Sequence, residues 1–342
     1  MAKKRLGFRV NKGFKLGLEV RVGTPHLRLE PTHLEIKMTA LDCQDIMMDD
    51  QIAAVQIGKG EVRGRILRLG TSLDEVLGGD RYPEPVARLL GEAVMISALV
   101  ASSLKFEGRF LVQAHGTNEG AVSMLAAECT TGGNMRAYAR YDAPSLERIL
   151  AENAHPDAKT LTGGGSFAMT IDPGSGKDRY QGISAIEGAT LDDCAEHFFK
   201  QSEQVPTRIK LAVGRLQLPG EAQQWRGGGI MVQRVAADAA RGDAEEAWDM
   251  SKAVMATLKD EELLDPDLGS ERLLYRLFHE QGVRMDTPTT VRAQCSCARE
   301  RLLATIKTFE PAQREDMFED GKITASCEFC ATDYVFTPKD VI

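Results

Sequence analysis

Two close pairs of cysteines near the C-terminus constrain this chain more than any other feature of its sequence. Cys295 and Cys297 form a C-x-C motif, and Cys327 and Cys330 form a C-x-x-C motif. A secreted disulfide scaffold distributes an even number of cysteines through a short chain, whereas this chain of 342 residues has seven, four of them in the last 48 residues. The pattern indicates a cytoplasmic protein with one local cysteine site. No role is assigned to the other cysteines, which are Cys43, Cys129 and Cys194.

Four thiolates in two close pairs suit tetrahedral Zn²⁺. Zinc binds thiolate sulfur at about 2.3 Å, which places the sulfurs of one site roughly 3.8 Å apart. The alternative is a local pair of redox disulfides without metal. A helix over 299–308 and a strand over 334–336 are predicted to complete a small module. The predicted ligands of one Zn²⁺ are Cys295, Cys297, Cys327 and Cys330.

A structural zinc ribbon is the commonest role for such a site, but the spacing also permits a redox role. Zinc keeps the sulfurs as thiolates, the form that oxidants attack. Arg299, Arg301 and a helix that begins just after Cys297 are expected to favour the thiolates further. Each pair can close on itself, because an extended C-x-C spans about 6.6 Å between Cα atoms and a C-x-x-C turn fits more easily. Loss of the metal would then unfold the tail.

Strand and helix signals mix without a regular βαβ alternation between residues 49 and 237, which predicts an α+β core. Glycine runs at Gly163 and Gly227 are interpreted as turns or bulges near strands. The helix over 191–204 is expected to begin with Thr190 as its N-cap. Strands are predicted over 51–57, 62–69, 110–115, 122–127, 135–140, 167–171, 180–186, 208–216 and 230–235, and further helices over 73–77, 85–104 and 146–151.

Charge separates two further regions from this core. Residues 1–48 carry nine basic and five acidic side chains without clear periodicity, which predicts an N-terminal extension that is disordered or not native. Strand signals stop after 236, and residues 238–286 carry thirteen acidic and six basic side chains. An acidic helical linker is therefore predicted over 238–294, either as an ordinary docked subdomain or as a marginal element that depends on its neighbour. Its apolar stripe, a candidate for client contact or for docking on the core, is Trp248, Met255, Leu258, Leu273, Leu274, Leu277 and Phe278.

Other classes of function fit poorly. The net charge is −8, and the segment 295–342 has more acidic than basic residues, which argues against a nucleic-acid-binding ribbon. A thiol–disulfide oxidoreductase would place C-x-x-C at a helix start, whereas strand-like residues follow Cys330. The nucleotide-binding motif G-x-x-x-x-G-K-[ST], H-E-x-x-H and G-x-S-x-G do not occur, and no apolar run approaches 18 residues. We therefore expect no active site, no ATP requirement and no membrane span.

The order of motifs resembles that of the 33-kDa chaperonin (heat-shock protein 33) family of redox-regulated chaperones. The resemblance runs from about Asp49 to the C-terminus, so residues 1–48 depart from it. It is carried by the two cysteine motifs with Tyr334 and Phe336, by Val62-Arg-Gly-Arg-Ile66, Tyr82-Pro-Glu-Pro-Val86, Tyr180-Gln-Gly-Ile183, Ser202-Glu-Gln-Val-Pro-Thr207 and Gly227-Gly-Gly-Ile-Met231 in the core, and by Glu261-Glu-Leu-Leu264 and Leu274-Tyr-Arg-Leu-Phe-His279 in the linker.

The resemblance implies a redox-switched holdase. The reduced monomer would bind one Zn²⁺ through the four cysteines and be inactive. Oxidation would form the disulfides Cys295–Cys297 and Cys327–Cys330, release zinc, and unfold the tail (295–342) and the linker. The exposed apolar surface would hold unfolding client proteins under oxidative stress, without ATP and as a homodimer. The resemblance implies a cytoplasmic protein without nucleic-acid or membrane partners. It also favours the interpretation of the linker as a marginal element that depends on its neighbour.

Overall fold

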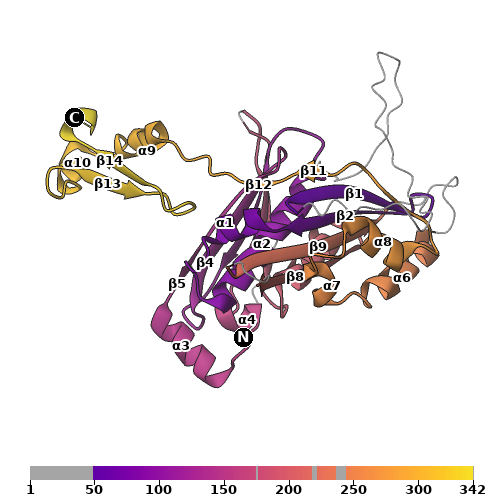
Figure 1. The fold of residues 1–342 in the computed structure, drawn as a ribbon. Coiled ribbons are helices and arrows are strands. Elements are labelled where there is room, and N and C mark those ends of the chain that lie inside the picture. The colour runs from indigo at the N-terminus through magenta and orange to yellow at the C-terminus, as the bar shows by residue number, and fades with distance from the viewer. Residues whose placement is uncertain (1–48, 175, 218–221, 236–243, 342) are drawn as a thin grey trace, which may run out of the picture.

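The computed structural model describes residues 49–174, 176–217, 222–235 and 244–341 (Figure 1). The predicted N-terminal extension, with Cys43, and the first residues of the predicted linker lie outside this part of the chain. The described residues form two six-stranded sheets, a set of helices and a small C-terminal unit, so the predicted α+β class is confirmed.

The first sheet is antiparallel and combines strands from both ends of the chain. Its strand order is β10-β1-β2-β9-β8, and β11 also pairs with β1. The strands are β1 (Gln51–Ile57), β2 (Val62–Leu69), β8 (Thr207–Leu216), β9 (Gln224–Arg234), β10 (Val283–Met285) and β11 (Thr289–Thr290).

The second sheet has the order β12-β5-β4-β3-β6-β7. All of its neighbours run antiparallel except β12, which lies parallel to β5. The strands are β3 (Arg109–His115), β4 (Val122–Thr130), β5 (Asn134–Tyr141), β6 (Ser166–Asp172), β7 (Tyr180–Ala185) and β12 (Arg292–Ala293).

Helix α2 (Glu84–Ala101) lies between the two sheets and contacts both. From Val86 onward almost every side chain of α2 is buried, because a helix that is apolar on all sides must be covered on all sides. Thr190 caps α5 as predicted, and its hydroxyl accepts from the Asp193 N–H at 3.3 Å. The other core helices are α1 (Thr71–Leu77), α3 (Ala143–Glu152), α4 (Ala158–Thr162) and α5 (Leu191–Phe198), which continues into a π-helical turn, Phe199–Glu203.

Both faces of the first sheet are apolar, and each is covered by a different part of the chain. Because side chains alternate along a strand, Ile52 and Leu67 point into the core cluster with α2, whereas Val55 and Ile66 belong to a second cluster on the opposite face. That opposite face is covered by the linker helices α6 (Ala244–Met255), α7 (Asp260–Leu264) and α8 (Ser270–Phe278). All seven residues of the predicted linker stripe are buried in this cluster, so in this structure the stripe docks on the core.

A buried arginine of the core anchors the linker. Arg68 on β2 is 4% exposed, and its guanidinium donates to the backbone carbonyls of Glu262, Leu263, Asp265 and Leu268 around the end of α7. Glu262 and Leu263 belong to the last turn of α7, where carbonyls lack partners within the helix, so the cation stabilises the helix end. Burial lowers the pKa of Arg68 to about 10.

Two expectations about this region are wrong. Strand signals were expected to stop after 236, but β10, β11 and β12 follow the linker helices; strands of two or three residues are too short to show alternation. Gly227 was expected in a turn or bulge, but the run lies inside β9. A Cβ atom at Gly228 would come within 2.2 Å of the Leu263 carbonyl oxygen, so the absent side chain lets α7 approach the sheet.

The C-terminal unit is small, and its predicted helix and strand are both present. Its apolar cluster has only four buried side chains, against which six partly buried apolar residues pack. Within the described residues no helix has the length and apolar character needed to cross a membrane. The elements are α9 (Arg299–Ile306), α10 (Pro311–Asp316), β13 (Ile323–Ser326), β14 (Asp333–Phe336) and α11 (Pro338–Val341), and the buried apolar side chains are Ile306, Ile323, Phe336 and Val341.

Candidate metal centre

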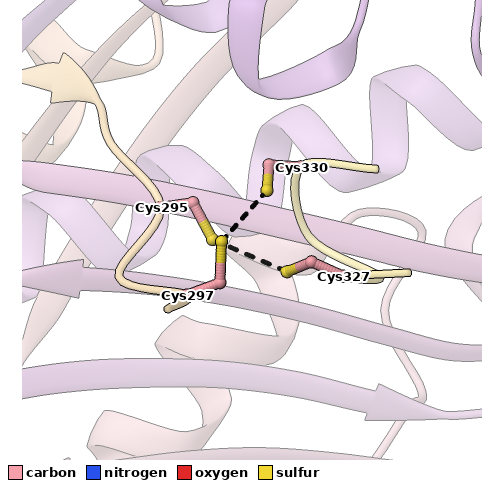
Figure 2. Close-up of side chains that lie close together, drawn as sticks. All are labelled: Cys295, Cys297, Cys327 and Cys330. Atoms are coloured by element: carbon pink, nitrogen blue, oxygen red, sulfur yellow. Dashed lines mark hydrogen bonds between the residues drawn. The ribbon is translucent and has the colours of Figure 1, made fainter. Parts of the chain in front are cut away.

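The four cysteines of the two motifs come together where the tail meets the core (Figure 2). Cys295 follows β12 by two residues, and the N–H of the intervening Gln294 donates to the Met135 carbonyl of β5 at 2.9 Å. Cys297 lies just before α9. The second pair flanks the turn between β13 and β14, and the Ala331 N–H closes this turn on the Cys327 carbonyl at 2.8 Å.

The sulfur positions fit a tetrahedral site. All four Sγ atoms lie within 4.8 Å of one another. The Sγ atoms of Cys295 and Cys327 are 3.7 Å apart. Those of Cys297 and Cys330 are 3.4 Å apart. A tetrahedral zinc with sulfur at about 2.3 Å needs separations of roughly 3.8 Å, so this donor set matches the ion in number, chemistry and spacing.

Hydrogen bonds around Cys330 favour its thiolate. Burial opposes ionisation, but hydrogen bonds from the side chain and backbone of Thr332 lower the pKa of Cys330 to about 6. The Thr332 Oγ1 lies 3.2 Å from this sulfur, and the Tyr334 hydroxyl lies 3.2 Å from the sulfur of Cys297. Burial raises the pKa of Cys295, Cys297 and Cys327.

The arginine beside the sulfurs comes from the core. Nη1 of Arg136 on β5 lies 3.8 Å from the sulfur of Cys295. The sequence had suggested Arg299 and Arg301 for this role. Arg299 instead pairs with Asp340 at 3.1 Å, and Arg301 donates to the Ser296 carbonyl. Sequence reasoning missed Arg136 because nothing local connects it to the cysteine motifs.

The remaining cysteines of the described chain lie apart from this centre. Cys129 and Cys194 are both buried in the core cluster. Burial raises the pKa of Cys129 to about 12, which disfavours the thiolate form that oxidants attack. Among the described residues, the four tail cysteines form the one group of three or more metal-ligating side chains with converging donor atoms.

Comparisons with known proteins agree on one family. A family model described as "Hsp33 protein" matches residues 50–337. A protein of Caulobacter vibrioides named "33 kDa chaperonin" is 45% identical over 293 residues, which cover 85% of this chain and 96% of that protein. A protein of the same name from Pseudomonas aeruginosa is 38% identical over 286 residues, covering 82% and 89%. A crystal structure of the Thermotoga maritima 33 kDa chaperonin, a heat shock protein 33 homologue, shares the fold with a TM-score of 0.70 at 21% identity, over 85% of this chain and 96% of that one.

Proposed function

Because this chain belongs to the Hsp33 family of chaperones, we propose that it is a redox-regulated, ATP-independent holdase. In the reduced monomer the four tail cysteines hold one Zn²⁺, and the chain does not bind client proteins. Under oxidative stress in the cytoplasm the cysteines pair as disulfides, and the tail and linker unfold. The oxidised chain dimerises and holds unfolding proteins until reductant returns. Its domains follow the boundaries drawn from the sequence: core 49–237, linker 238–294 and redox-switch domain 295–342.

One observation carries this proposal: the linker covers an apolar face of the first sheet and runs directly into the cysteine centre. Only Gln294 separates β12 from Cys295. The covered face includes Val55, Ile66 and Val232, so its exposure would create an apolar surface for unfolded chains. A bound Zn²⁺ would cross-link the tail and keep the sulfurs ionised.

The oxidation step balances with peroxide as the oxidant. Two thiolates give up two electrons and form one S–S bond; hydrogen peroxide takes these electrons with two protons and becomes two waters. Sulfurs paired in this way no longer ligate a metal. We propose the pairs Cys295–Cys297 and Cys327–Cys330; four cysteines allow three pairings, and separations within 4.8 Å leave all three open.

The test follows zinc and client holding in the same samples. A colorimetric chelator reports zinc release while peroxide is added at mild heat, and light scattering reports aggregation of a thermally unfolding client. We expect one zinc per chain, released in step with the gain in holding, and both changes reversed by dithiothreitol with zinc. Zinc retained under oxidant with no gain in holding would overturn the switch and leave a structural zinc site.

A further inference from the structure

A row of exposed or half-buried cationic and aromatic side chains lies on the outer face of β5. Because side chains alternate, Met135 and Ala137 point into the core, whereas residues 136, 138 and 140 point outward. Arg81, which follows α1, extends this row. Figure 1 shows the β13–β14 hairpin of the tail reaching toward the second sheet. We name this surface the Arg-Tyr face, and it consists of Arg81, Arg136, Tyr138 and Arg140.

The acidic residue of the C-x-x-C turn is bound by two arginines of this face. The Arg140 guanidinium donates to both carboxylate oxygens of Glu328, at 2.7 and 2.8 Å. Arg81 donates to the backbone carbonyls of Glu328 and Phe329, at 2.7 and 3.1 Å. A bidentate arginine–carboxylate pair requires a specific geometry. The Arg81 hydrogen bonds are made to backbone carbonyls and so do not depend on the side chain of the bound residue.

The next residue of the turn is held by an aromatic and a cation. The Phe329 ring makes an edge contact with Tyr138, with centroids 4.8 Å apart, and the Arg136 guanidinium lies 4.1 Å from the Phe329 ring centroid. Arg136 is itself fixed by Glu128, directly opposite on β4, whose carboxylate accepts from it at 3.0 and 3.1 Å. Glu128 is 5% exposed, so the cation that contacts the ring is held in place.

We propose that the Arg-Tyr face is a peptide-recognition site for an acidic residue followed by an aromatic one, and that Glu328-Phe329 is its built-in occupant. A tethered segment reaches millimolar effective concentration, so it excludes a free ligand of moderate affinity. Both occupant residues stand between Cys327 and Cys330, so disruption of the cysteine centre removes the occupant from the face. The vacated face then receives acidic-aromatic segments of unfolded clients, an inference that rests on the proposed function.

The test uses the full chain and a fluorescent peptide that copies residues 324–333 with serine for both cysteines. A control peptide carries alanine in place of the glutamate and the phenylalanine. Fluorescence anisotropy compares the reduced zinc-loaded chain, the peroxide-treated chain, and a reduced Glu328→Ala/Phe329→Ala variant that lacks the built-in occupant. We expect at least tenfold tighter binding of the first peptide by the last two proteins, and at least tenfold weaker binding of the control peptide.

Variants of the face locate the site. In the occupant-free background, Arg140→Ala and Tyr138→Ala are each expected to weaken peptide binding about tenfold, and added salt should weaken it further because the arginines are exposed. Arg148→Ala, an exposed arginine on α3, is the matched control and should change nothing. Equal binding of both peptides, or unchanged binding by the face variants, would overturn the proposed site.

The occupant-free variant separates this inference from the proposed function. If it binds the peptide but peroxide produces neither binding nor holding, the face stands and the redox switch fails. If peroxide produces holding but neither protein binds the peptide, the switch stands and the face is only a docking surface for the tail.

Discussion

The core around α2 draws buried apolar side chains from both sheets and several helices, whereas the apolar cluster of the tail has four buried members. A segment of 48 residues cannot bury enough surface to offset the entropy of ordering its chain, so such a module depends on a cross-link. The four converging sulfurs could hold a metal ion that provides such a cross-link. Packing holds the core together, whereas in the proposed function a metal cross-link holds the tail and an oxidant can break it.

The largest effect is expected from Cys327→Ser. This is the most buried of the four tail cysteines, at 8% exposed, and structural zinc contributes roughly 10–16 kcal/mol to coupled binding and folding in small modules. We expect loss of stoichiometric zinc and rapid tryptic cleavage within 295–342, while the core fragment resists.

Cys194→Ala is the control for this experiment, because it removes a buried thiol of the core and should keep one zinc per chain. A Cys327→Ser chain that retains its zinc and resists trypsin like the wild type would contradict the ligand assignment.

Packing in the core is tested by Leu90→Ala. Leu90 on α2 has no exposed surface, so the cavity should cost about 2–5 kcal/mol in the free energy of urea unfolding, with zinc stoichiometry unchanged. Ile183→Ala removes an equally apolar side chain that is 48% exposed, and it should cost far less. Equal losses in the two variants would show that packing around α2 does not dominate core stability.

The stability of the core and the stability of the tail should change in opposite directions with pH. Glu92 on α2 is half-buried and accepts from the Leu191 N–H at 2.8 Å; desolvation of its carboxylate, then the neighbouring Asp192, raises its pKa from 4.5 to about 8. The folded chain holds a proton there that the unfolded chain releases, so core stability should fall as pH rises from about 4.5 to about 8, on the order of a few kcal/mol. The tail should weaken as pH falls, because protons compete with a metal for thiolates.

Urea unfolding across this pH range, with chelator titration of zinc in parallel, checks both signs. Glu92→Gln keeps an acceptor for Leu191 and should flatten the pH dependence of the core. A wild-type core whose stability does not fall over this range would refute the role given to Glu92.

The smallest effect is expected at the contact between linker and core. Arg68→Ala removes a donor to the carbonyls around the end of α7, at a cost of about 1–3 kcal/mol. Hydrogen exchange should then speed up over 260–278 in the reduced chain, and holding should rise before any oxidation. Arg63→Ala is the control, because Arg63 lies on the same strand as Arg68, β2, and pairs in register with Gln56 of β1 and Gln233 of β9. Equal exchange in both variants would show that Arg68 does not hold the linker.

Sequence reasoning succeeded where the signal was local. The spacing of the four cysteines predicted a convergent site, and the structure brings their sulfurs together. The contribution of Arg136 was not accessible, because it depends on the register of β5 against β4 and on where the tail docks. The hydroxyl groups of Thr332 and Tyr334 were missed for a similar reason: their value as donors appears only once the turn between β13 and β14 is formed.

The position of the linker also depends on contacts that the local sequence does not reveal. Its amphipathic stripe was visible as a helical period, but the stripe alone could not say whether it met the core or a partner. The answer is in the first sheet, where alternate residues of β1 such as Ile52 and Val55 serve two different clusters. A strand with two apolar faces needs two covering layers, and recognising the second layer requires knowing that β1 and β2 are neighbours.

The pairing of β10 and β11 with β1 has a consequence beyond burial. These short strands are the last elements before β12 and the cysteines, and they bond along the side of β1 that β2 leaves open. Were they to detach with the linker, β1 would become an edge strand with a row of unsatisfied N–H and C=O groups. Such an edge can accept an extended peptide by β-augmentation, with main-chain hydrogen bonds that are indifferent to sequence. A chain built to hold many different unfolded proteins would then bind them partly through the one feature that all of them share, the backbone.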